Sequence, residues 1–396
     1  MLKKVFKSYD FPIFITVVLL CLFGLVMVYS SSMVTAVARY GEEMDFFYQK
    51  QKTAMILAFF LMLVAMIIPY KLYQQKKILM LMMSGIIGFL FLIFFIGHTA
   101  GGAQSWINVG TRAIQPGEFS KLAIIIYLAA IFGKRQHIIN SIDKAVVPPI
   151  TMLLIICALI AIQPDFGTAF IILLIAASII IASGMSMKSL GKLLGISLIV
   201  AAIISLAILI SGNFSEVVSK ERVSRFTGLQ TPFDPETIKD EGFHLANSLI
   251  AFGSGGVTGL GLGDSVQKYG YLPESHTDFI LAIIGEELGL FGVVFVLGAL
   301  GFIVLRGFVL AARCPDPFGS LLMVGISSMI GIQVFINAGG VSGLIPITGI
   351  TLPFISYGGS SLLILMISIG ILQNVVMRSN RLAEKKMQVK EKNIPM

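Results

Sequence analysis

The chain has 396 residues, of which 56% are hydrophobic and only 13% are charged, and its mean hydropathy is +0.91. Because soluble domains carry about a quarter charged residues, this composition excludes a soluble globular protein. The net charge of +8 gives no indication of nucleic-acid binding, and the three isolated cysteines and four dispersed histidines form neither a disulfide nor a metal-binding pattern.

The first predicted element is a transmembrane helix. Residues 1–10 carry Lys3, Lys4 and Lys7 ahead of an apolar run from Phe11 to Tyr29. That run is longer than the ~7 to 15 residues of a signal-peptide core, so we predict that it spans the membrane. Apolar stretches of about 20 residues, enough to cross a bilayer, then recur along the chain. The predicted spans lie near residues 11–31, 53–69, 78–97, 119–133, 146–162, 166–184, 190–211, 279–305, 318–338 and 355–377.

One of these apolar stretches is too long for a single crossing. It runs from Val146 to Ala182 and is interrupted by the polar sequence from Gln163 to Gly167. Pro164 breaks a helix at this point, because proline lacks a backbone N–H. We therefore predict an all-α polytopic membrane protein of about ten transmembrane helices, with residues 1–396 forming a single membrane domain.

The basic residues concentrate on one side of the predicted membrane. Of the 29 Lys and Arg residues, 19 fall in the termini and in alternate predicted loops, which the positive-inside rule assigns to the cytoplasm. Both termini are thus predicted to be cytoplasmic: residues 1–10, and the basic tail 378–396 as a disordered anchor or partner contact. The 19 residues are Lys3, Lys4, Lys7, Lys71, Lys76, Lys77, Lys134, Arg135, Lys144, Lys188, Lys192, Arg306, Arg313, Arg378, Arg381, Lys385, Lys386, Lys390 and Lys392.

Three loops of unusual sequence fall on the opposite, outer side: residues 98–118, 212–278 and 339–354. The large extracytoplasmic loop 212–278 separates predicted helices seven and eight. Loops longer than about 15 residues are usually either functional or disordered, and we favour a functional loop here. Any chemistry is therefore predicted to lie outside the cytoplasm.

The first outer loop ends in a charged helix mouth. Trp106 lies in this loop, and the helix that follows carries Glu118 and Lys121, which share a face because they are three residues apart. One interpretation is a paired helix cap. The other, which we favour, is a functional site, because charges at the mouth of a membrane helix are costly and tend to mark function.

A second acid, Asp165, opens the predicted helix that starts near residue 166. A carboxylate at a helix N-terminus is stabilised by the helix dipole. Its role is either that of a plain N-terminal charge or that of an outer-face site residue.

The strongest group of polar residues runs from Pro273 into the eighth predicted helix. Glu274, His276 and Asp278 lie at the helix mouth, and Glu286 and Glu287 lie about two turns deeper. Asp278 is placed to accept a proton from a sugar hydroxyl as a general base, although Thr277 or Asp278 is alternatively an N-cap. The two deeper glutamates line a cavity or, as we favour, form a structural polar network.

Two glycine-rich segments accompany these acids. Residues 253–263 carry six glycines but lack the strand–turn–helix context of a nucleotide fingerprint, so we assign them to backbone flexibility or close approach to a ligand. Residues 349–361, with Ser356, lead into the last predicted helix and suit helix packing or headgroup contact.

Together these segments resemble the shape, elongation, division and sporulation (SEDS) family over nearly the whole chain. Residues 263–268 and 271–274 resemble its division branch more than its elongation branch. One departure is Ser105, where the family often has arginine, and Arg112 is the candidate substitute. The matching stretches are residues 24–32, 106–121, 163–169, 254–292, 337–343, 346–349 and 352–361.

The resemblance implies a peptidoglycan glycosyltransferase that polymerises lipid II on the outer face of the cytoplasmic membrane. Asp278 matches the family's essential acid, and Glu118 and Lys121 match its paired charges. Lys121 with Arg112 would offset diphosphate charge, and a divalent cation, Mg²⁺ or Mn²⁺, held by Asp278 or a neighbouring acid would stabilise the leaving group. The remaining substrate-binding candidates are Trp106, Asp165, Glu274, His276 and Ser356.

The resemblance also implies partners: a class B penicillin-binding transpeptidase and regulatory proteins of the division septum. Two other functions remain open. A lipid II flippase would place charges near the membrane midplane, whereas the acids here concentrate at the outer rim. A scaffold without chemistry would leave those acids unexplained.

Overall fold

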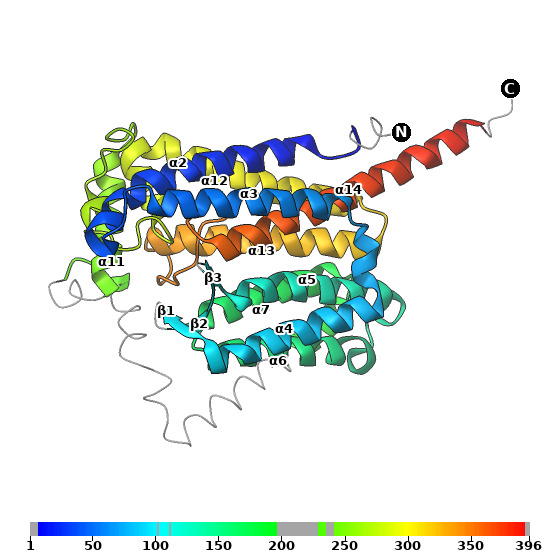
Figure 1. Ribbon diagram of the computed structural model, residues 1–396. Coiled ribbons are helices and arrows are strands. Elements are labelled where there is room, and N and C mark those ends of the chain that lie inside the picture. The colour runs from blue at the N-terminus through cyan, green and yellow to red at the C-terminus, as the bar shows by residue number, and fades with distance from the viewer. Residues whose placement is uncertain (1–6, 101–102, 111, 196–228, 235–240, 393–396) are drawn as a thin grey trace, which may run out of the picture.

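The computed structural model describes residues 7–100, 103–110, 112–195, 229–234 and 241–392, which form a bundle of roughly aligned helices (Figure 1). Nine of the ten predicted spans correspond to described helices, and most of the predicted span 190–211 lies outside the described residues. The helices are α2 (Phe11–Tyr40), α3 (Phe46–Ile67), α4 (Lys76–Ile96), α5 (Pro116–Lys134), α6 (Val147–Ile162), α7 (Phe166–Ala182), α11 (Glu241–Gly255), α12 (Ile280–Arg313), α13 (Pro317–Val341) and α14 (Gly359–Lys392).

Seven of these helices are long and apolar enough to cross a membrane, which confirms a polytopic membrane protein. The predicted break in the fifth apolar stretch is also confirmed. Helix α6 ends at Ile162 and α7 begins at Phe166, and the Asp165 side chain caps α7 by accepting from the Thr168 N–H at 3.1 Å. Both helices are apolar but shorter than the other spans, with 16 and 17 residues.

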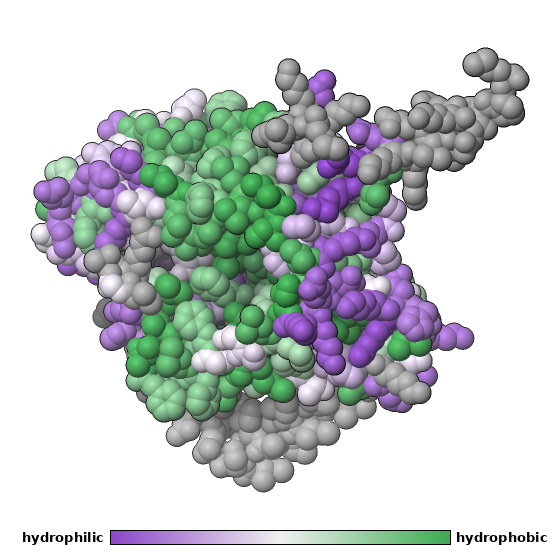
Figure 2. All heavy atoms as spheres, turned by 45° about the vertical axis from the view of Figure 1, so that its right-hand side comes forward, coloured by the Kyte–Doolittle hydropathy of each residue, from purple (hydrophilic) through white to green (hydrophobic). Residues whose placement is uncertain are grey.

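The two ends of the bundle differ in charge. The start of α2 and the end of α14 lie at one end (Figure 1), where Arg306 pairs with Asp10 at 2.8 Å and Lys134 donates to the carbonyl of Gln74. Figure 2 shows a wide hydrophobic belt between two hydrophilic regions. We call the end with Arg306 and Lys134 the basic end, and its assignment to the cytoplasm stays a prediction.

The opposite end holds structure that the sequence did not indicate. A small antiparallel sheet forms from β1 (His98–Ala100), β2 (Ala103–Val109) and β3 (Arg112–Ile114), in the order β1-β2-β3. Helix α11 lies within the predicted loop 212–278. At the basic end, α14 continues to Lys392, so a disordered tail is wrong for residues 378–392, and the alternative of a partner contact stays a prediction.

Helix α12 is interrupted at Gly289, where φ is 65° and ψ is −160°. The segment after α11 fills the gap in the hydrogen-bond ladder. The Leu260 N–H donates to the Glu286 carbonyl at 2.9 Å, and the Gly261 N–H donates to the Glu287 carbonyl at 3.0 Å. The interruption therefore leaves these backbone groups paired, as a membrane environment demands.

This close approach explains the glycines of residues 253–263. A Cβ added at Gly255 would overlap the Gly285 carbonyl oxygen, and one added at Gly259 would overlap that of Glu287. Glycine is required where two backbones touch, because any side chain would separate them. At these two positions the close approach is to the backbone of α12, and the predicted approach to a ligand stays a prediction.

We expect Gly255→Ala to lower the stability of the protein by about 1 to 3 kcal/mol, since it overpacks the contact between α11 and α12. The matched control is Gly253→Ala in the same helix, where an added Cβ meets no atom within 4 Å. That change should be neutral or stabilising by up to ~1 kcal/mol, because alanine favours helix. Thermal unfolding in detergent, followed by circular dichroism, distinguishes the two. Equal melting temperatures would contradict the close-packing argument.

Candidate functional site

Asp278 lies partly exposed at the mouth of α12, at the end of the bundle opposite the basic end. The Thr277 hydroxyl is 2.9 Å from Asp278 Oδ1 and 2.8 Å from Glu274 Oε2, so both carboxylates converge on one hydroxyl. The N-cap position of α12 is Phe279, and no side chain caps that helix end. The alternative that Thr277 or Asp278 is only an N-cap is therefore wrong.

The backbone of Asp278 is fixed by Asn337 of α13. The Asn337 amide donates to the Asp278 carbonyl and to the Ile350 carbonyl, each at 2.7 Å. Asn337 thereby holds the segment 342–358, which precedes α14, against the mouth of α12. Gly349 of this segment lies beside the Asp278 carboxylate, because a Cβ added there would be 4.0 Å from Oδ2.

Glu118 and Lys121 form the predicted ion pair in the first turns of α5. Lys121 Nζ is 2.7 Å from Glu118 Oε1, and both side chains are buried. Burial of a charged pair is tolerated only when each partner satisfies the other, so removing one charge would leave an unpaired buried ion. The pair is confirmed, and its role in substrate binding stays a prediction.

Asp165 lies next to the start of α5. Its carboxylate accepts from the Gln115 side chain at 2.9 Å as well as capping α7. The neighbouring Gly167 faces the Thr348 carbonyl oxygen. The segment 342–358 thus contacts the start of α7 on one side and the mouth of α12 on the other, and it connects the two groups of acids.

His276 is buried between aromatic rings. Its ring centroid is 4.4 Å from that of Phe47 and 5.6 Å from that of Tyr357. Burial lowers the pKa of His276 to about 4, a shift that the nearby Glu274 carboxylate opposes. The imidazole is therefore neutral at pH 7, and Nδ1 has no hydrogen-bond partner among the described residues.

The other predicted site residues differ in their surroundings. Glu274 pairs with Arg39 at 3.6 Å, and both side chains are about half exposed. The Ser356 hydroxyl is buried and accepts from the Leu352 N–H at 2.8 Å, so it stabilises its own turn. Trp106 is half-buried in β2, paired with His98. Arg112 begins β3, and its side chain lies outside the described part of the chain.

Glu286 and Glu287 belong to the buried polar network that we favoured. Glu287 Oε1 is 2.9 Å from Lys268 Nζ, and the Ser30 hydroxyl donates to Glu287 at 2.7 Å. Glu286 accepts from the Ser265 hydroxyl and from the Val266 N–H. The network therefore ties α2, the segment after α11, and α12 together.

Two residues of this region were not identified from the sequence. Lys268 follows a glycine-rich stretch, a context typical of a solvated loop residue, yet its side chain is fully buried. Asn337 lies within an apolar span, and the signal available for it was a polar side chain inside a membrane helix.

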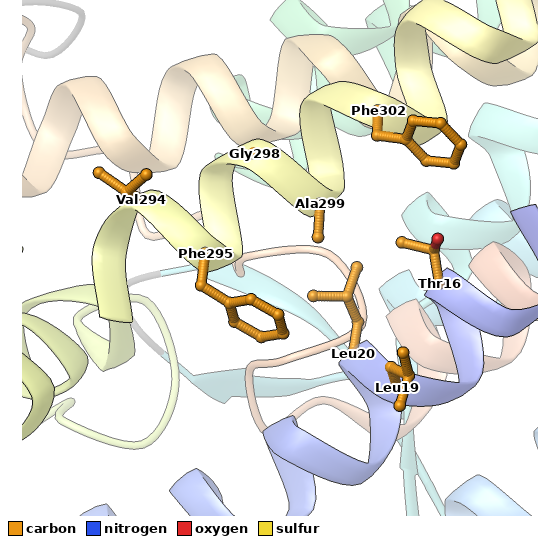
Figure 3. A pocket seen from close by; sticks show the side chains of 8 residues that line it. All are labelled: Thr16, Leu19, Leu20, Val294, Phe295, Gly298, Ala299 and Phe302. Carbon is orange, nitrogen blue, oxygen red and sulfur yellow. The ribbon is translucent and has the colours of Figure 1, made fainter. Parts of the chain in front are cut away.

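Two cavities accompany the site without including Asp278. A groove of about 360 Å³ between α2 and α12 is lined almost entirely by apolar side chains such as Leu20, Phe295 and Phe302 (Figure 3). It lies along the membrane-spanning part of both helices. A second recess of about 270 Å³ lies at the C-terminal end of α2, between Arg39, Tyr269 and Pro273.

The predicted cation near Asp278 would need several oxygen ligands. Within the described residues, no group of three or more His, Cys, Asp and Glu side chains gathers at one point. Asp278 and Glu274 supply two carboxylates around Thr277. Mg²⁺ is commonly held by one or two carboxylates together with substrate phosphates and water. Two carboxylates therefore suit a divalent cation that takes its other ligands from outside the protein, and the cation stays a prediction.

The fold and the site define a polytopic membrane protein with a group of acids at the end of the bundle opposite its basic end. The model of a cell cycle protein family, which comprises FtsW, RodA and SpoVE, matches residues 11–381, and the chain belongs to this family. This confirms the resemblance inferred from the sequence.

The relatives agree with this assignment. The chain is 54% identical over 381 residues to a Bacillus subtilis (strain 168) protein named "Probable peptidoglycan glycosyltransferase FtsW". The aligned region covers 95% of this chain and 93% of the relative. It is 38% identical to stage V sporulation protein E of the same organism, over 93% of this chain and 97% of the relative. The higher identity to FtsW agrees with the predicted division branch.

Solved structures share the fold. A chain from a peptidoglycan synthase complex that coordinates polymerization and crosslinking superposes with a TM-score of 0.71 at 24% identity, over 94% of this chain and 98% of the other. Rod shape determining protein RodA of Thermus thermophilus gives a TM-score of 0.64 at 23% identity, over 94% and 97% of the two chains.

Proposed function

We propose that the chain is a peptidoglycan glycosyltransferase of the division type that polymerises lipid II, with Asp278 as its general base. The observation that supports this most is the position of Asp278. It is a partly exposed carboxylate at the mouth of α12, with its backbone fixed by Asn337, at the end opposite the basic end. The FtsW relative at 54% identity carries the same activity in its name.

In the proposed reaction, Asp278 accepts the proton of the acceptor sugar hydroxyl as that oxygen attacks the anomeric carbon of the donor. The bond from this carbon to the lipid diphosphate breaks, and the diphosphate leaves with the electron pair. Lys121, paired with Glu118, and Arg112 offset charge on the diphosphate. Trp106, Asp165, Glu274, His276 and Ser356 complete the proposed substrate-binding group.

The proposal includes a divalent cation, Mg²⁺ or Mn²⁺, held by Asp278 and Glu274. When bound, such a cation stabilises charge on the leaving diphosphate. We expect EDTA to slow polymerisation at least ~10-fold and added Mg²⁺ to restore it. Glu274→Gln should raise the Mg²⁺ concentration needed for the half-maximal rate. Asp264→Asn, which removes an exposed acid of the same end, should leave that concentration unchanged. An unchanged rate in EDTA would remove the cation from the proposal.

The proposed partner is a class B penicillin-binding transpeptidase, together with regulatory proteins of the division septum. The structural neighbour that belongs to a peptidoglycan synthase complex supports a partnership of this kind. We further propose that the basic end faces the cytoplasm, so that both termini are cytoplasmic and the acids face outward.

The function is tested by supplying purified lipid II to the protein with its class B partner in liposomes, without nucleotide. We expect glycan strands, measured as a ladder on a gel. A parallel assay follows fluorescent lipid II across the bilayer. Translocation without polymerisation would replace the proposal with a flippase, and neither activity would favour a scaffold.

A further inference from the structure

We propose that the segment of residues 256–271 is an interfacial element that rests in the outer leaflet of the bilayer and sets the depth of Asp278. Its exposed apolar side chains contact lipid at the level where the acyl chains meet the headgroups. We call the side chains of Val257, Leu260, Leu262, Leu290 and Phe291 the rim patch.

The depth of this segment follows from α12. The Arg306–Asp10 ion pair, at 2.8 Å, marks the basic boundary of the apolar region. Residues 288–305 of α12 contain no charged side chain, and at 1.5 Å per residue Glu286 lies ~30 Å from Arg306. That distance matches the thickness of the hydrocarbon core. Glu286 and Glu287 therefore mark the outer boundary.

Helix α2 is consistent with this depth. Residues 11–38 contain no charged side chain, and Ser30, the first of three consecutive serines, lies about 20 residues, or ~30 Å, from Asp10. The Ser30 hydroxyl donates to Glu287 at 2.7 Å. Two helices joined by one ion pair near the basic end thus meet again in the buried network, one hydrocarbon thickness away.

The segment after α11 lies at this boundary because its backbone pairs there. The Leu260 and Gly261 N–H groups donate to the Glu286 and Glu287 carbonyls, and the Leu290 N–H donates to the Gly256 carbonyl at 3.0 Å. Irregular backbone is tolerated at membrane depth only when its polar groups are paired in this way.

The side chains of the segment are arranged as lipid contact requires. Two of its polar side chains, Ser265 and Lys268, turn inward and are fully buried, whereas Asp264 beside them is exposed. The rim patch turns outward: Val257, Leu262 and Phe291 are 58%, 56% and 69% exposed. No charged residue occurs between positions 253 and 263. Tyr269 and Tyr271 are also exposed, and tyrosine is enriched where lipid meets water.

The depth of the segment determines the height of Asp278 above the membrane, and the importance of that height rests on the proposed function. Asp278 precedes Glu286 by eight residues and so lies ~10 Å outside the hydrocarbon boundary. The sugars of a lipid-linked diphosphate emerge just outside the headgroups, at this height. Seating the rim patch in lipid would hold the base level with the hydroxyl that it deprotonates.

The test uses spin labels in lipid nanodiscs, on a background in which Cys21, Cys157 and Cys314 are replaced by alanine. Labels are placed at Leu262→Cys, at Val294→Cys in the membrane-spanning part of α12, and at Glu42→Cys in the exposed turn after α2. We expect the ratio of oxygen to nickel-chelate collisions at position 262 to lie below that at 294, which is deeper in the bilayer, and to exceed that at 42 severalfold. A ratio like that at position 42, or low collision with both probes, would overturn the proposal.

A second variant tests the depth argument separately. Leu262→Asp should slow polymerisation severalfold in liposomes and leave the rate in detergent unchanged, because no bilayer sets the depth there. Equal slowing in both would overturn the depth argument. The spin-label result requires no activity, so the lipid contact stands or fails independently of the proposed function.

Discussion

Asp278→Asn should abolish glycan polymerisation while leaving the fold intact. Asparagine has the shape of aspartate but cannot accept a proton, and general-base catalysis contributes about 10² to 10⁴ in rate. The bond from Asn337 reaches the backbone carbonyl of Asp278, so the substitution does not disturb it. The measurement is the rate and length of glycan strands from purified lipid II, with the class B partner present.

The matched control is Asp264→Asn, which removes an exposed carboxylate from the same end of the bundle. It changes the charge equally without touching the mouth of α12, and we expect wild-type strands. Equal ladders from wild type and Asp278→Asn would remove Asp278 from the mechanism. A loss in both variants would indicate that the net charge of this end matters rather than one base.

The membrane spans could be predicted because their signal is one-dimensional. An apolar run must be about 20 residues long to cross the bilayer, and Pro164 must interrupt a helix wherever it falls. The position of Asp278 followed in the same way, since it is the last acid before an apolar run. The ion pair of Glu118 and Lys121 also followed, because a spacing of three residues fixes a shared helix face.

The contacts between distant segments could not be predicted in this way. Lys268 and Ser30 are separated by 238 residues, and nothing in either local sequence specifies that both meet Glu287. Asn337 is 59 residues from Asp278, and their contact depends on how α13 packs against α12. The sheet β1-β2-β3 was missed for a related reason, since strands of three to seven residues show too little alternation to be recognised.

The missed contacts of Lys268 and Ser30 with Glu287 lie beside the break in α12. A break in α12 at Gly289 would expose backbone groups at the edge of the membrane, and the segment after α11 pairs with them. The buried network then holds that segment in place through Glu286 and Glu287. The glycines were visible in the sequence, but the partner that required them was not.

The buried network leads to the largest expected effect on stability. Lys268→Met should lower the free energy of unfolding by about 3 to 5 kcal/mol, because it leaves Glu287 buried without its cation. Both side chains are fully buried, and their charged atoms lie 2.9 Å apart. Ser30→Ala keeps the ion pair and removes the hydroxyl that donates to Glu287 and accepts from Lys268, so its effect should be smaller, about 1 to 3 kcal/mol. Thermal unfolding in detergent measures both.

The double variant Lys268→Met with Glu287→Gln separates charge from packing. It removes both charges and should be more stable than Lys268→Met alone, since no unpaired ion remains in the interior. If the single and double variants melt together, the loss comes from the shape of the methionine rather than from the orphaned carboxylate. If Lys268→Met melts with the wild type, Lys268 is solvated in the membrane protein, and the segment after α11 is held to α12 by the Glu286 hydrogen bonds and the backbone pairing near Gly289.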